Sequence, residues 1–315
     1  MTSYRGVLQP LSYGFFICSL LLMLGVTVLD MSKNQREKTM DYVQEDRKKL
    51  LKQMCHEEDL MKKPKLHHLL VDDAHGIIYC YVPKVACTNW KRFLVVLKRG
   101  EPYGNPRNVT VHVHVTSLIT YLKKYPKNEL EARLKHYTKF LFVRDPFIRL
   151  ISAYRHKLER PNGYFYKVYG RDIMRRHANY SNPPSTVEEA FKLGMHPSFK
   201  DFIKYLLDPE TQSKALNNEH WRQIHKLCSP CLIDYDFIGH QENMSEDAEH
   251  LMRILRLQND ITFPPSYDNV TNNQFVGNWF KGVPPENRRK LYQLYEKDFK
   301  LFGYRKPDDL IAGLI

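Results

Sequence analysis

One segment, residues 76–97, constrains the fold more than any other part of the chain. It begins with the apolar run Gly-Ile-Ile-Tyr-Cys at 76–80, which predicts a short buried strand. A tight loop containing Lys84 and Thr88 follows, and a helix is predicted over 90–97. In this layout, backbone N–H groups at the helix N-terminus and the lysine ammonium can hold an anion. The loop lacks the glycines of a Walker A sequence, so we expect a phosphate-like ligand rather than a nucleoside triphosphate with magnesium.

A second strand-to-helix junction carries polar side chains of a similar kind. Residues 139–143 have the pattern of another short apolar strand, and Arg144 follows directly. Pro146 suits the first position of the next helix, where no N–H donor is needed, and Ser152 lies about two turns further along. An arginine and a hydroxyl at such a junction can bind a second phosphate. Two anion sites among alternating strands and helices predict an α/β fold whose ligand is phosphorylated at two places.

Five stretches of sequence together carry a resemblance to a known family. They are Tyr-Val-Pro-Lys-Val-Ala-Cys-Thr-Asn-Trp-Lys-Arg at 81–92, Leu-Phe-Val-Arg-Asp-Pro-Phe at 141–147, Asn-Glu-His-Trp at 218–221, Cys-Ser-Pro-Cys at 228–231 and the tail from Leu291 to Tyr304. In this order and spacing they resemble the Golgi carbohydrate sulfotransferases, in particular the chondroitin 4-O-sulfotransferase branch, over roughly residues 67–310. The resemblance implies a P-loop-like α/β fold with a central parallel sheet flanked by helices.

The resemblance also implies a donor and a reaction. Enzymes of this family transfer a sulfuryl group from 3′-phosphoadenosine 5′-phosphosulfate (PAPS). By similarity, Arg144 and Ser152 would bind the 3′-phosphate of PAPS. The residues implied for its 5′-phosphosulfate are Pro83, Lys84, Val85, Ala86, Cys87, Thr88 and Asn89. The implied acceptor is the 4-hydroxyl of N-acetylgalactosamine in chondroitin, with dermatan as a related chain. A sulfuryl group carries less charge than a terminal phosphoryl group, so no metal ion is expected.

Other functions remain compatible with the sequence. Related branches of the family sulfate terminal N-acetylgalactosamine on N-glycans or the 3-hydroxyl of glucuronic acid. A non-catalytic Golgi glycan-binding protein is an alternative of another class, although such a protein would tolerate the loss of Lys84 and Arg144, which this chain retains. A P-loop kinase-like enzyme would need a glycine-rich loop and a Ser or Thr directly after the loop lysine, and the sequence has neither.

Lys84 and a histidine are the predicted catalytic residues. The Lys84 ammonium is suited to stabilise charge that grows on the leaving oxygen. A general base must take the proton of the acceptor hydroxyl, and His112 and His114 lie between the two anion motifs. Alternation would put both on one face of an extended segment. Residues 114–116 resemble the segment that carries the catalytic histidine of a related uronyl sulfotransferase. We therefore predict His114 as the base and His112 as the alternative; a third interpretation is two solvated histidines without a catalytic role.

Candidate contacts to the acceptor lie later in the chain. Glu219, His220 and Trp221 combine a carboxylate, an imidazole and an aromatic ring of the kind that stacks on a sugar face, although His220 and Trp221 would equally suit a core. At residues 239–242 the family has the pattern Gly-Lys-x-Glu. This chain matches the glutamate with Glu242 but has His240 where the family has lysine. The charge at that position would therefore depend on pH.

The overall charge is compatible with a soluble basic surface or with an anionic partner. The chain of 315 residues has a net charge of +13, and with 43% hydrophobic residues it is globular rather than disordered. Nucleic acid and a sulfated or uronate-rich glycan fit this charge equally well. The resemblance selects the glycan, so no nucleic-acid partner is expected.

The N-terminal region has the pattern of a membrane anchor. Residues 11–29 are 19 uncharged positions, just long enough for a transmembrane helix. No small-x-small cleavage site follows, which favours an uncleaved signal anchor over a cleaved signal peptide. Arg5 precedes the span and Lys33, Arg36 and Lys38 follow it, so the charges do not indicate an orientation. The resemblance to type II Golgi membrane enzymes implies that the N-terminus is cytoplasmic.

These patterns divide the chain into four parts. We expect a cytoplasmic tail at 1–10, the transmembrane anchor at 11–29, a charged and partly helical stem at 30–66, and a luminal sulfotransferase domain at 67–315. Four N-glycosylation sequons support a luminal glycoprotein; they begin at Asn108, Asn179, Asn243 and Asn269.

The cysteines beyond the predicted anchor are odd in number. They are Cys55, Cys80, Cys87, Cys228 and Cys231. One of these cysteines is expected to remain free or to form a disulfide with another chain. We interpret Cys87 as a small residue that packs within the loop. Cys228 and Cys231 form a Cys-x-x-Cys motif that could close a local disulfide, bond to different partners or, with His220 and His225, bind zinc. An oxidising lumen favours disulfides.

Overall fold

The computed structural model describes residues 31, 35–55, 63–114, 117–265 and 276–314. The chain divides into two compact units, residues 1–45 and 46–315. The described residues of the first unit are helical, and so are residues 46–55 at the start of the second. Among the described helices, none has the length and apolar character needed to cross a bilayer. The predicted anchor at 11–29 lies outside the described residues.

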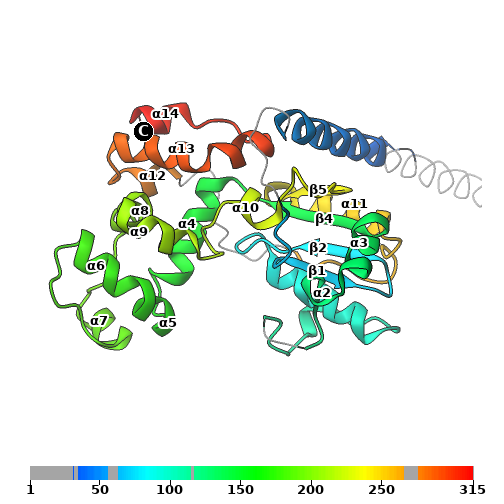
Figure 1. The fold of residues 1–315 in the computed structure, drawn as a ribbon, viewed down its shortest axis with the longest axis horizontal. Coiled ribbons are helices and arrows are strands. Elements are labelled where there is room, and N and C mark those ends of the chain that lie inside the picture. Colours follow the sequence, from blue (N-terminus) through cyan, green and yellow to red (C-terminus); the bar gives the residue numbers. More distant parts are fainter. Residues whose placement is uncertain (1–30, 32–34, 56–62, 115–116, 266–275, 315) are drawn as a thin grey trace, which may run out of the picture. The chain divides into compact units, whose positions relative to one another are not determined.

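A mixed sheet of five strands forms one half of the second unit, on the right in Figure 1. In spatial order the strands are β3 (Thr120–Tyr121), β1 (Leu69–Asp72), β2 (Ile77–Cys80), β4 (Thr138–Val143) and β5 (Phe237–His240). Strands β2, β4 and β5 run parallel, whereas β1 is antiparallel to both β2 and β3. The expected parallel sheet is therefore confirmed for three strands and wrong for the other two.

The antiparallel part follows from a short connection. Residues 73–76 alone separate β1 from β2, and so short a link reverses the chain, whereas a parallel pair needs a crossover of a dozen or more residues. Gly76 within this turn has a φ of +61°, which L side chains rarely adopt. Helices fill the connections from β2 to β4 and from β4 to β5, so those neighbours run parallel.

The predicted strands and helix at the two anion motifs are confirmed. The apolar runs at 76–80 and 139–143 correspond to β2 and β4, whose residues are almost all buried. The helix expected over 90–97 is the central part of α2 (Cys87–Arg99). Strand β5 approaches β4 closely at Gly239, because a Cβ there would lie 2.2 Å from the Phe142 ring. Only glycine fits this position.

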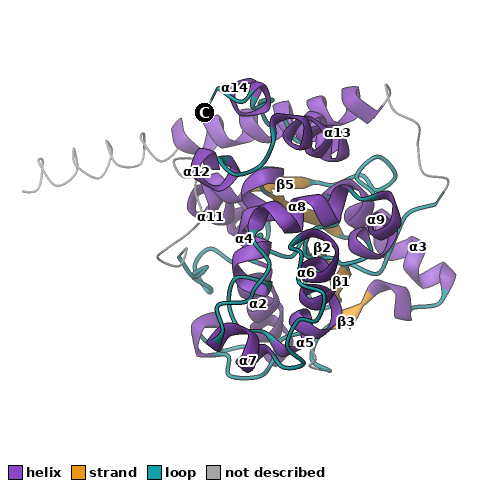
Figure 2. Ribbon diagram, turned by 90° about the vertical axis from the view of Figure 1, so that its left-hand side faces the viewer, coloured by secondary structure: helices purple, strands orange, loops and turns teal. Residues whose placement is uncertain are grey.

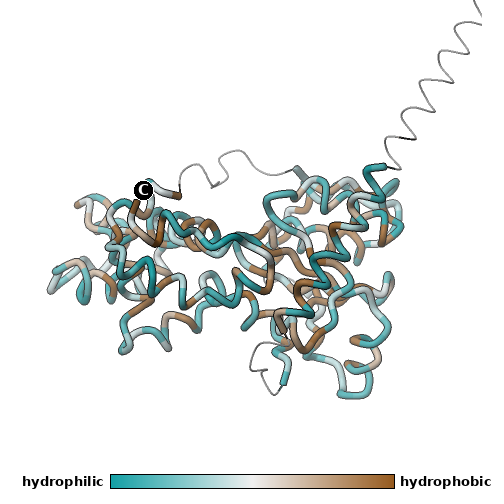
Figure 3. The backbone as a smooth tube through the Cα atoms, turned by 90° about the horizontal axis from the view of Figure 1, so that it is seen from above, coloured by the Kyte–Doolittle hydropathy of each residue, from teal (hydrophilic) through white to brown (hydrophobic). Residues whose placement is uncertain are grey.

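Helices surround the sheet and build a second core beside it (Figures 1 and 2). Besides α2, they are α3 (Lys127–His136), α4 (Pro146–Lys157), α5 (Gly163–Phe165), α6 (Arg171–His177), α7 (Val187–Lys192), α8 (Phe199–Leu207), α9 (Pro209–Leu216), α10 (Ile224–Cys228), α11 (Met244–Ile254), α12 (Val276–Phe280), α13 (Pro285–Leu301) and α14 (Asp308–Ala312). The first core joins the strands with α2 and α11, and the second joins α4, α8 and α13. Brown and teal alternate along the helices in Figure 3, as expected where one face of each helix is buried.

Helix α4 leads from the sheet into the second core. Its N-cap Asp145 accepts hydrogen bonds from the N–H groups of Phe147 and Ile148, each over 2.9 Å. Pro146 occupies the first helical position, as predicted. Phe147 and Tyr154 then pack among the aromatic side chains of the second core. The start of α4 is thereby fixed at the carboxyl end of β4.

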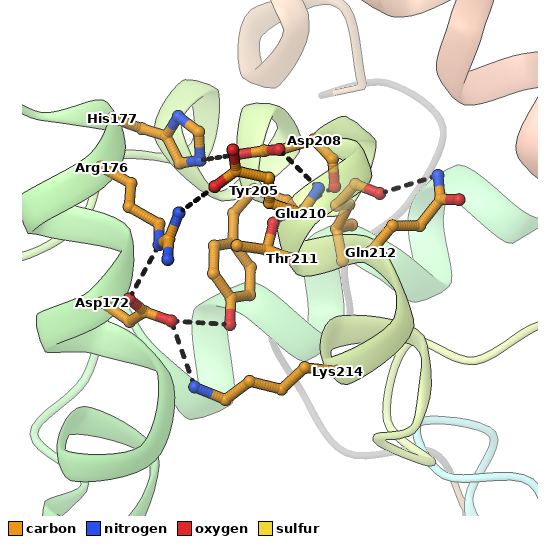
Figure 4. A network of polar contacts seen from close by, with 10 residues as sticks. Asp172, Arg176, His177, Tyr205, Asp208, Glu210, Thr211, Gln212 and Lys214 are labelled. Carbon is orange, nitrogen blue, oxygen red and sulfur yellow. Dashed lines mark hydrogen bonds and ion pairs between the residues drawn. The ribbon is translucent and has the colours of Figure 1, made fainter.

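A polar network ties α6 to α8 and α9 (Figure 4). Asp172 accepts from Arg176 at 3.1 Å, from the Tyr205 hydroxyl at 3.2 Å and from Lys214 at 3.1 Å. Arg176 also donates to Glu210 at 2.8 Å. One carboxylate thus links three helices at the outer edge of the second core.

Two disulfides join distant parts of the chain. Cys55 is bonded to Cys231, and Cys80, at the end of β2, is bonded to Cys228. The Cys-x-x-Cys motif therefore bonds to different partners. The alternative of a local disulfide between Cys228 and Cys231 is therefore wrong. Because both cysteines are in disulfides, neither offers a thiolate to a zinc ion. Among the described cysteines Cys87 is free.

The structure describes the asparagines of three of the four predicted glycosylation sequons. Asn108, Asn179 and Asn243 are exposed. Asn269 lies outside the described residues. An exposed asparagine is what a glycosylation acceptor requires, so three of the four sites are sterically open.

Candidate active site

A cleft of about 860 Å³ opens where the parallel strands end and the second core begins. Its lining comprises Tyr81, Pro83, Lys84, Ala86, Cys87, Thr88, Asn89, His112, His114, Arg144, Ser152, Arg155, His156, Lys157, Arg160, Glu219, His220, Gln241, Met244, Phe263 and Pro264. Both predicted anion motifs and both candidate histidines therefore face one cavity. Among the described residues, this lining holds five Lys or Arg side chains and one carboxylate, so the cleft is suited to a polyanionic ligand.

The loop between β2 and α2 adopts an unusual backbone without glycine. Lys84 has a φ of 72° and Ala86 a φ of 48°, both in the left-handed region. Non-glycine residues in that region are strained and concentrate at ligand-binding loops. Ala86 is the N-cap of α2, and no side chain caps that helix terminus. The Asn89 N–H donates to the Ala86 carbonyl oxygen at 2.9 Å, so an anion in the cleft would meet the N–H groups of Cys87 and Thr88 at the start of α2.

Lys84 lies at the centre of the basic lining. The pKa of its ammonium is lowered to about 8, mainly by burial and in addition by the nearby charges of Lys157, Arg144 and Arg155. A cation that is partly buried among other cations binds an anion strongly, because the anion relieves the repulsion between the positive charges.

Arg144 and Ser152 lie where the sequence predicted, on the cleft wall formed by the end of β4 and by α4. Arg144 is only 5% exposed, and its Nη1 donates to the Lys84 carbonyl oxygen over 3.2 Å. One helical face of α4 continues from Ser152 to Arg155 and His156, which also line the cleft. These two residues were missed, although their spacing of three and four positions from Ser152 was a readable signal.

His114 is held by two polar neighbours. Its Nδ1 lies 3.3 Å from Lys91 Nζ, and its Nε2 lies 3.3 Å from Thr88 Oγ1. Burial and the Lys91 charge lower the pKa of His114 to about 4, so the imidazole is neutral at physiological pH. The ring of His112 is 5.7 Å away. The two histidines are neighbours as expected, but residues 111–114 form a bend and turn rather than an extended segment.

Arg149 connects the two sides of the cleft and was not predicted. Its guanidinium is buried and donates to the carbonyl oxygens of Pro83 at 3.0 Å, Glu219 at 2.9 Å and Arg222 at 2.7 Å. It thereby fixes the loop after β2 against residues 219–222. Nothing in the local sequence pattern distinguishes this arginine from a surface one.

Glu219 is the acidic residue in the described lining of the cleft. Its Oε2 accepts from the Tyr81 hydroxyl at 2.9 Å and lies 3.7 Å from His68 Nε2. The neighbouring His220 also lines the cleft, and burial, reinforced by Lys157 and Lys84, lowers its pKa to about 2. Glu219 and His220 are therefore placed as predicted, with His220 neutral.

Two other predicted acceptor contacts need correction. Trp221 is 1% exposed and packs among Phe165, Tyr169 and Phe202, so its ring has no face for a sugar. Glu242 does not line the cleft. It accepts from the Asp145 N–H at 3.1 Å and from the Tyr304 hydroxyl at 2.9 Å, and so supports the start of α4.

Two further residues of these regions are also away from the cleft surface. Val85 is fully buried, so only its backbone can contribute to an anion site. His240 stacks on Tyr304, and burial lowers its pKa to about 3. In the part of the chain that the structure describes, no group of three or more His, Cys, Asp or Glu side chains is arranged to hold a metal ion.

The strained loop at Lys84 and the basic wall at the ends of the parallel strands give this α/β protein a cleft suited to a phosphorylated ligand. Comparison with known proteins gives the family: the sulfotransferase family profile matches residues 67–305, and the chain belongs to this family. It is a sulfotransferase enzyme.

Proteins from several vertebrates are similar in sequence to most of this chain. Carbohydrate sulfotransferase 12 of Mus musculus is 47% identical over 295 residues, covering 86% of this chain and 70% of the relative. Carbohydrate sulfotransferase 11 of Rattus norvegicus is 40% identical over 248 residues, covering 78% and 69%. Carbohydrate sulfotransferase 9 of Homo sapiens is 34% identical over 288 residues, covering 87% and 63%. No solved structure matches the chain significantly.

Proposed function

We propose that this enzyme transfers a sulfuryl group from PAPS to the 4-hydroxyl of N-acetylgalactosamine in chondroitin chains, with dermatan as a related acceptor. The observation that carries the proposal is the union of both predicted anion motifs, His114 and Glu219 in one basic cleft. The relatives named carbohydrate sulfotransferase 12 and 11, at 47% and 40% identity, support a carbohydrate acceptor.

The residues of the cleft fit PAPS. The strained loop, the uncapped N-terminus of α2 and Lys84 suit the 5′-phosphosulfate, and Arg144 with Ser152 suits the 3′-phosphate. Of the seven loop residues predicted to bind the donor, Pro83, Lys84, Ala86, Cys87, Thr88 and Asn89 line the cleft. When bound, PAPS supplies the activated sulfuryl group.

The roles of the protein side chains follow from their positions. The Lys84 ammonium stabilises the negative charge that the donor nucleotide retains as the sulfuryl group leaves. Arg144 and Ser152 hold that nucleotide in one orientation. His114, neutral at physiological pH, takes the proton of the acceptor hydroxyl.

The same proposal includes a cellular setting. The enzyme would be a single-pass type II membrane glycoprotein of the Golgi apparatus, with the anchor at 11–29, the stem at 30–66 and the sulfotransferase domain luminal. Two disulfides support an oxidising compartment, and the exposed asparagines of three sequons support passage through the secretory pathway. Protease protection of the domain in intact Golgi vesicles, with and without detergent, tests this topology.

Transfer of radiolabelled sulfate from PAPS to a panel of glycans tests the reaction. The panel contains desulfated chondroitin, desulfated dermatan and an N-glycan with terminal N-acetylgalactosamine, each digested to disaccharides or monosaccharides afterwards. We expect label on the 4-hydroxyl of N-acetylgalactosamine in chondroitin. Label on the 3-hydroxyl of glucuronic acid or only on the N-glycan would replace the acceptor, and PAPS binding without any transfer would favour a non-catalytic glycan-binding protein.

A further inference from the structure

Three cations of the cleft belong to neither anion motif. Arg155, Lys157 and Arg160 come from the end of α4 and the loop beyond it, and all three line the cleft. The donor is already matched by the loop at Lys84 and by Arg144 with Ser152. The additional positive charge therefore calls for a second anionic ligand or a structural explanation.

A structural explanation accounts for Arg155, in part for Lys157 and not for Arg160. Basic residues in the last turn of a helix stabilise it by complementing the helix dipole, and Arg155 is in addition paired with Glu159 at 3.7 Å. Arg160, however, lies beyond the C-cap Leu158 and is exposed. The Lys157 ammonium lies 4.7 Å from the centre of the Phe165 ring and faces the cleft rather than only the helix end.

The Phe165 ring, beside Lys157, also lies close to two other rings. Its ring centre lies 5.2 Å from that of His220, a cleft residue, and 5.4 Å from that of Tyr164. Phe165 itself is 6% exposed, whereas Tyr164 is 67% exposed. Tyr164, Lys157 and the cleft residue His220 therefore all lie against the ring of Phe165.

We propose that Lys157 and Arg160 bind an anionic group of the acceptor glycan, a carboxylate or a sulfate, and that Tyr164 stacks against a sugar ring of the same chain. This inference rests on the proposed function and adds the residues that select an anionic acceptor. Arginine and lysine pair with carboxylate or sulfate oxygens, and an exposed tyrosine presents an apolar face with a polar tip. Tyr164 would supply the stacking surface that the buried Trp221 cannot.

Acceptor kinetics and donor binding together test this assignment. Lys157→Ala and Arg160→Ala are compared, in the full chain, with Lys192→Ala on the exposed side of α7 as the matched control. Each variant is assayed with unsulfated chondroitin, chondroitin 6-sulfate and carboxyl-reduced chondroitin. We expect the KM for unsulfated chondroitin to rise by about 10-fold, the size of a charge-assisted contact, while the Kd for 3′-phosphoadenosine 5′-phosphate changes by less than about 3-fold. Lys157→Arg should restore most of the affinity.

The acceptor series identifies the anionic group. If the group is the uronate carboxylate, wild type and variants have the same KM for carboxyl-reduced chondroitin; if it is a sulfate, the difference between them is confined to the sulfated chain. Tyr164→Ala should raise the KM for all three chains, and Tyr164→Phe should not. Equal loss of donor binding and acceptor affinity would assign the two cations to the donor, and a KM that is unchanged for all three chains would overturn the subsite.

A direct binding measurement separates this inference from the proposed reaction. Titration of unsulfated chondroitin into the complex of the enzyme with 3′-phosphoadenosine 5′-phosphate needs no turnover. Wild-type binding that Lys157→Ala and Arg160→Ala weaken supports the subsite even if the sulfated position differs from the one proposed. Absence of binding by the wild type, together with absence of transfer, would overturn both.

Discussion

Arg144 donates a hydrogen bond from Nη1 to the main-chain carbonyl oxygen of Lys84 over 3.2 Å. The bond joins the end of β4 to the loop after β2, two segments that are 60 positions apart in the chain. The two predicted anion motifs are therefore one structural unit. A change at Arg144 acts on the donor through its own charge and through the shape of the Lys84 loop.

Lys84→Ala should reduce turnover by ~10²–10³-fold or more, because it removes a preorganised cation from the position where charge develops. The change shortens a flexible side chain and leaves the cleft walls in place, so the melting temperature should stay close to that of the wild type. Sulfate transfer and thermal unfolding measured on the same preparation check both parts. Near-normal turnover in a folded Lys84→Ala variant would contradict the assignment of this loop to the donor.

Arg144→Ala should weaken the binding of 3′-phosphoadenosine 5′-phosphate by ~10–100-fold, as expected for loss of a charge-assisted contact. Ser152→Ala should weaken it less, by ~2–10-fold, since a neutral hydrogen bond contributes less. Calorimetric titration measures both, with Arg175→Ala on the exposed side of α6 as the control. If donor affinity stayed constant and only glycan affinity fell, the 3′-phosphate site would lie elsewhere.

The strands and the helix start at the two anion motifs could be predicted because each depends on the residue types in one short segment. Strands β2 and β4 are apolar runs bounded by polar residues, and Pro146 marks the start of α4. Arg149 could not be found in this way, because its three carbonyl acceptors are 66 to 73 positions away. The antiparallel β1 was missed because the resemblance suggested a wholly parallel sheet.

The predicted acceptor residues were the least reliable for a similar reason. An aromatic ring reads alike in sequence whether it stacks on a sugar or fills a core, and only packing separates Trp221, which is buried, from Tyr164, which is exposed. Glu242 likewise matched a family pattern, yet its carboxylate accepts from the Asp145 N–H. His112 and His114 are neighbours as predicted, with ring centres 5.7 Å apart, although the backbone that brings them together is a turn rather than the expected strand.

His114→Ala should lower turnover by ~10²–10⁴-fold with little change in PAPS affinity, since a positioned base acts on the chemical step. His112→Ala should be milder, because only one imidazole can face the acceptor hydroxyl. Turnover and donor affinity, measured separately, distinguish these effects. Loss of activity in His112→Ala with retention in His114→Ala would exchange the roles, and activity in both variants would direct the search to Glu219 or His220.

The pH dependence gives an independent check on His114. Its pKa is lowered to about 4, so the neutral form that can accept a proton predominates above that pH and is lost as the pH falls through it. The acid limb of kcat/KM, which reports the free enzyme, should therefore lie near pH 4 rather than near the ordinary histidine value of about 6.5. An acid limb close to pH 6.5 that persists in His114→Ala would mean that another group is the base.

Lys91→Met should shift this acid limb to higher pH. Lys91 is 2% exposed, with its Nζ 3.3 Å from His114 Nδ1 and 3.9 Å from the centre of the Tyr81 ring. The Lys91 ammonium disfavours a second positive charge beside it, and it therefore disfavours protonation of His114. Methionine keeps the apolar volume without the charge. Kinetic pH profiles of wild type and Lys91→Met decide the point, and coincident acid limbs would show that Lys91 does not control His114.

Arg47→Ala should destabilise the fold by about 3–5 kcal/mol, since it leaves a buried carboxylate unpaired. Arg47 Nη1 lies 2.9 Å from both oxygens of Asp247, whose side chain is fully buried, and also donates to the Ile238 carbonyl at 2.8 Å. Lys52→Ala, an exposed change on the same helix, is the control and should shift the free energy of unfolding by no more than about 0.5 kcal/mol. Denaturant unfolding measures both variants. A loss below about 1 kcal/mol in Arg47→Ala would mean that water or a neighbouring group replaces the guanidinium, and that the helix over residues 46–55 is not held to β5 by this pair.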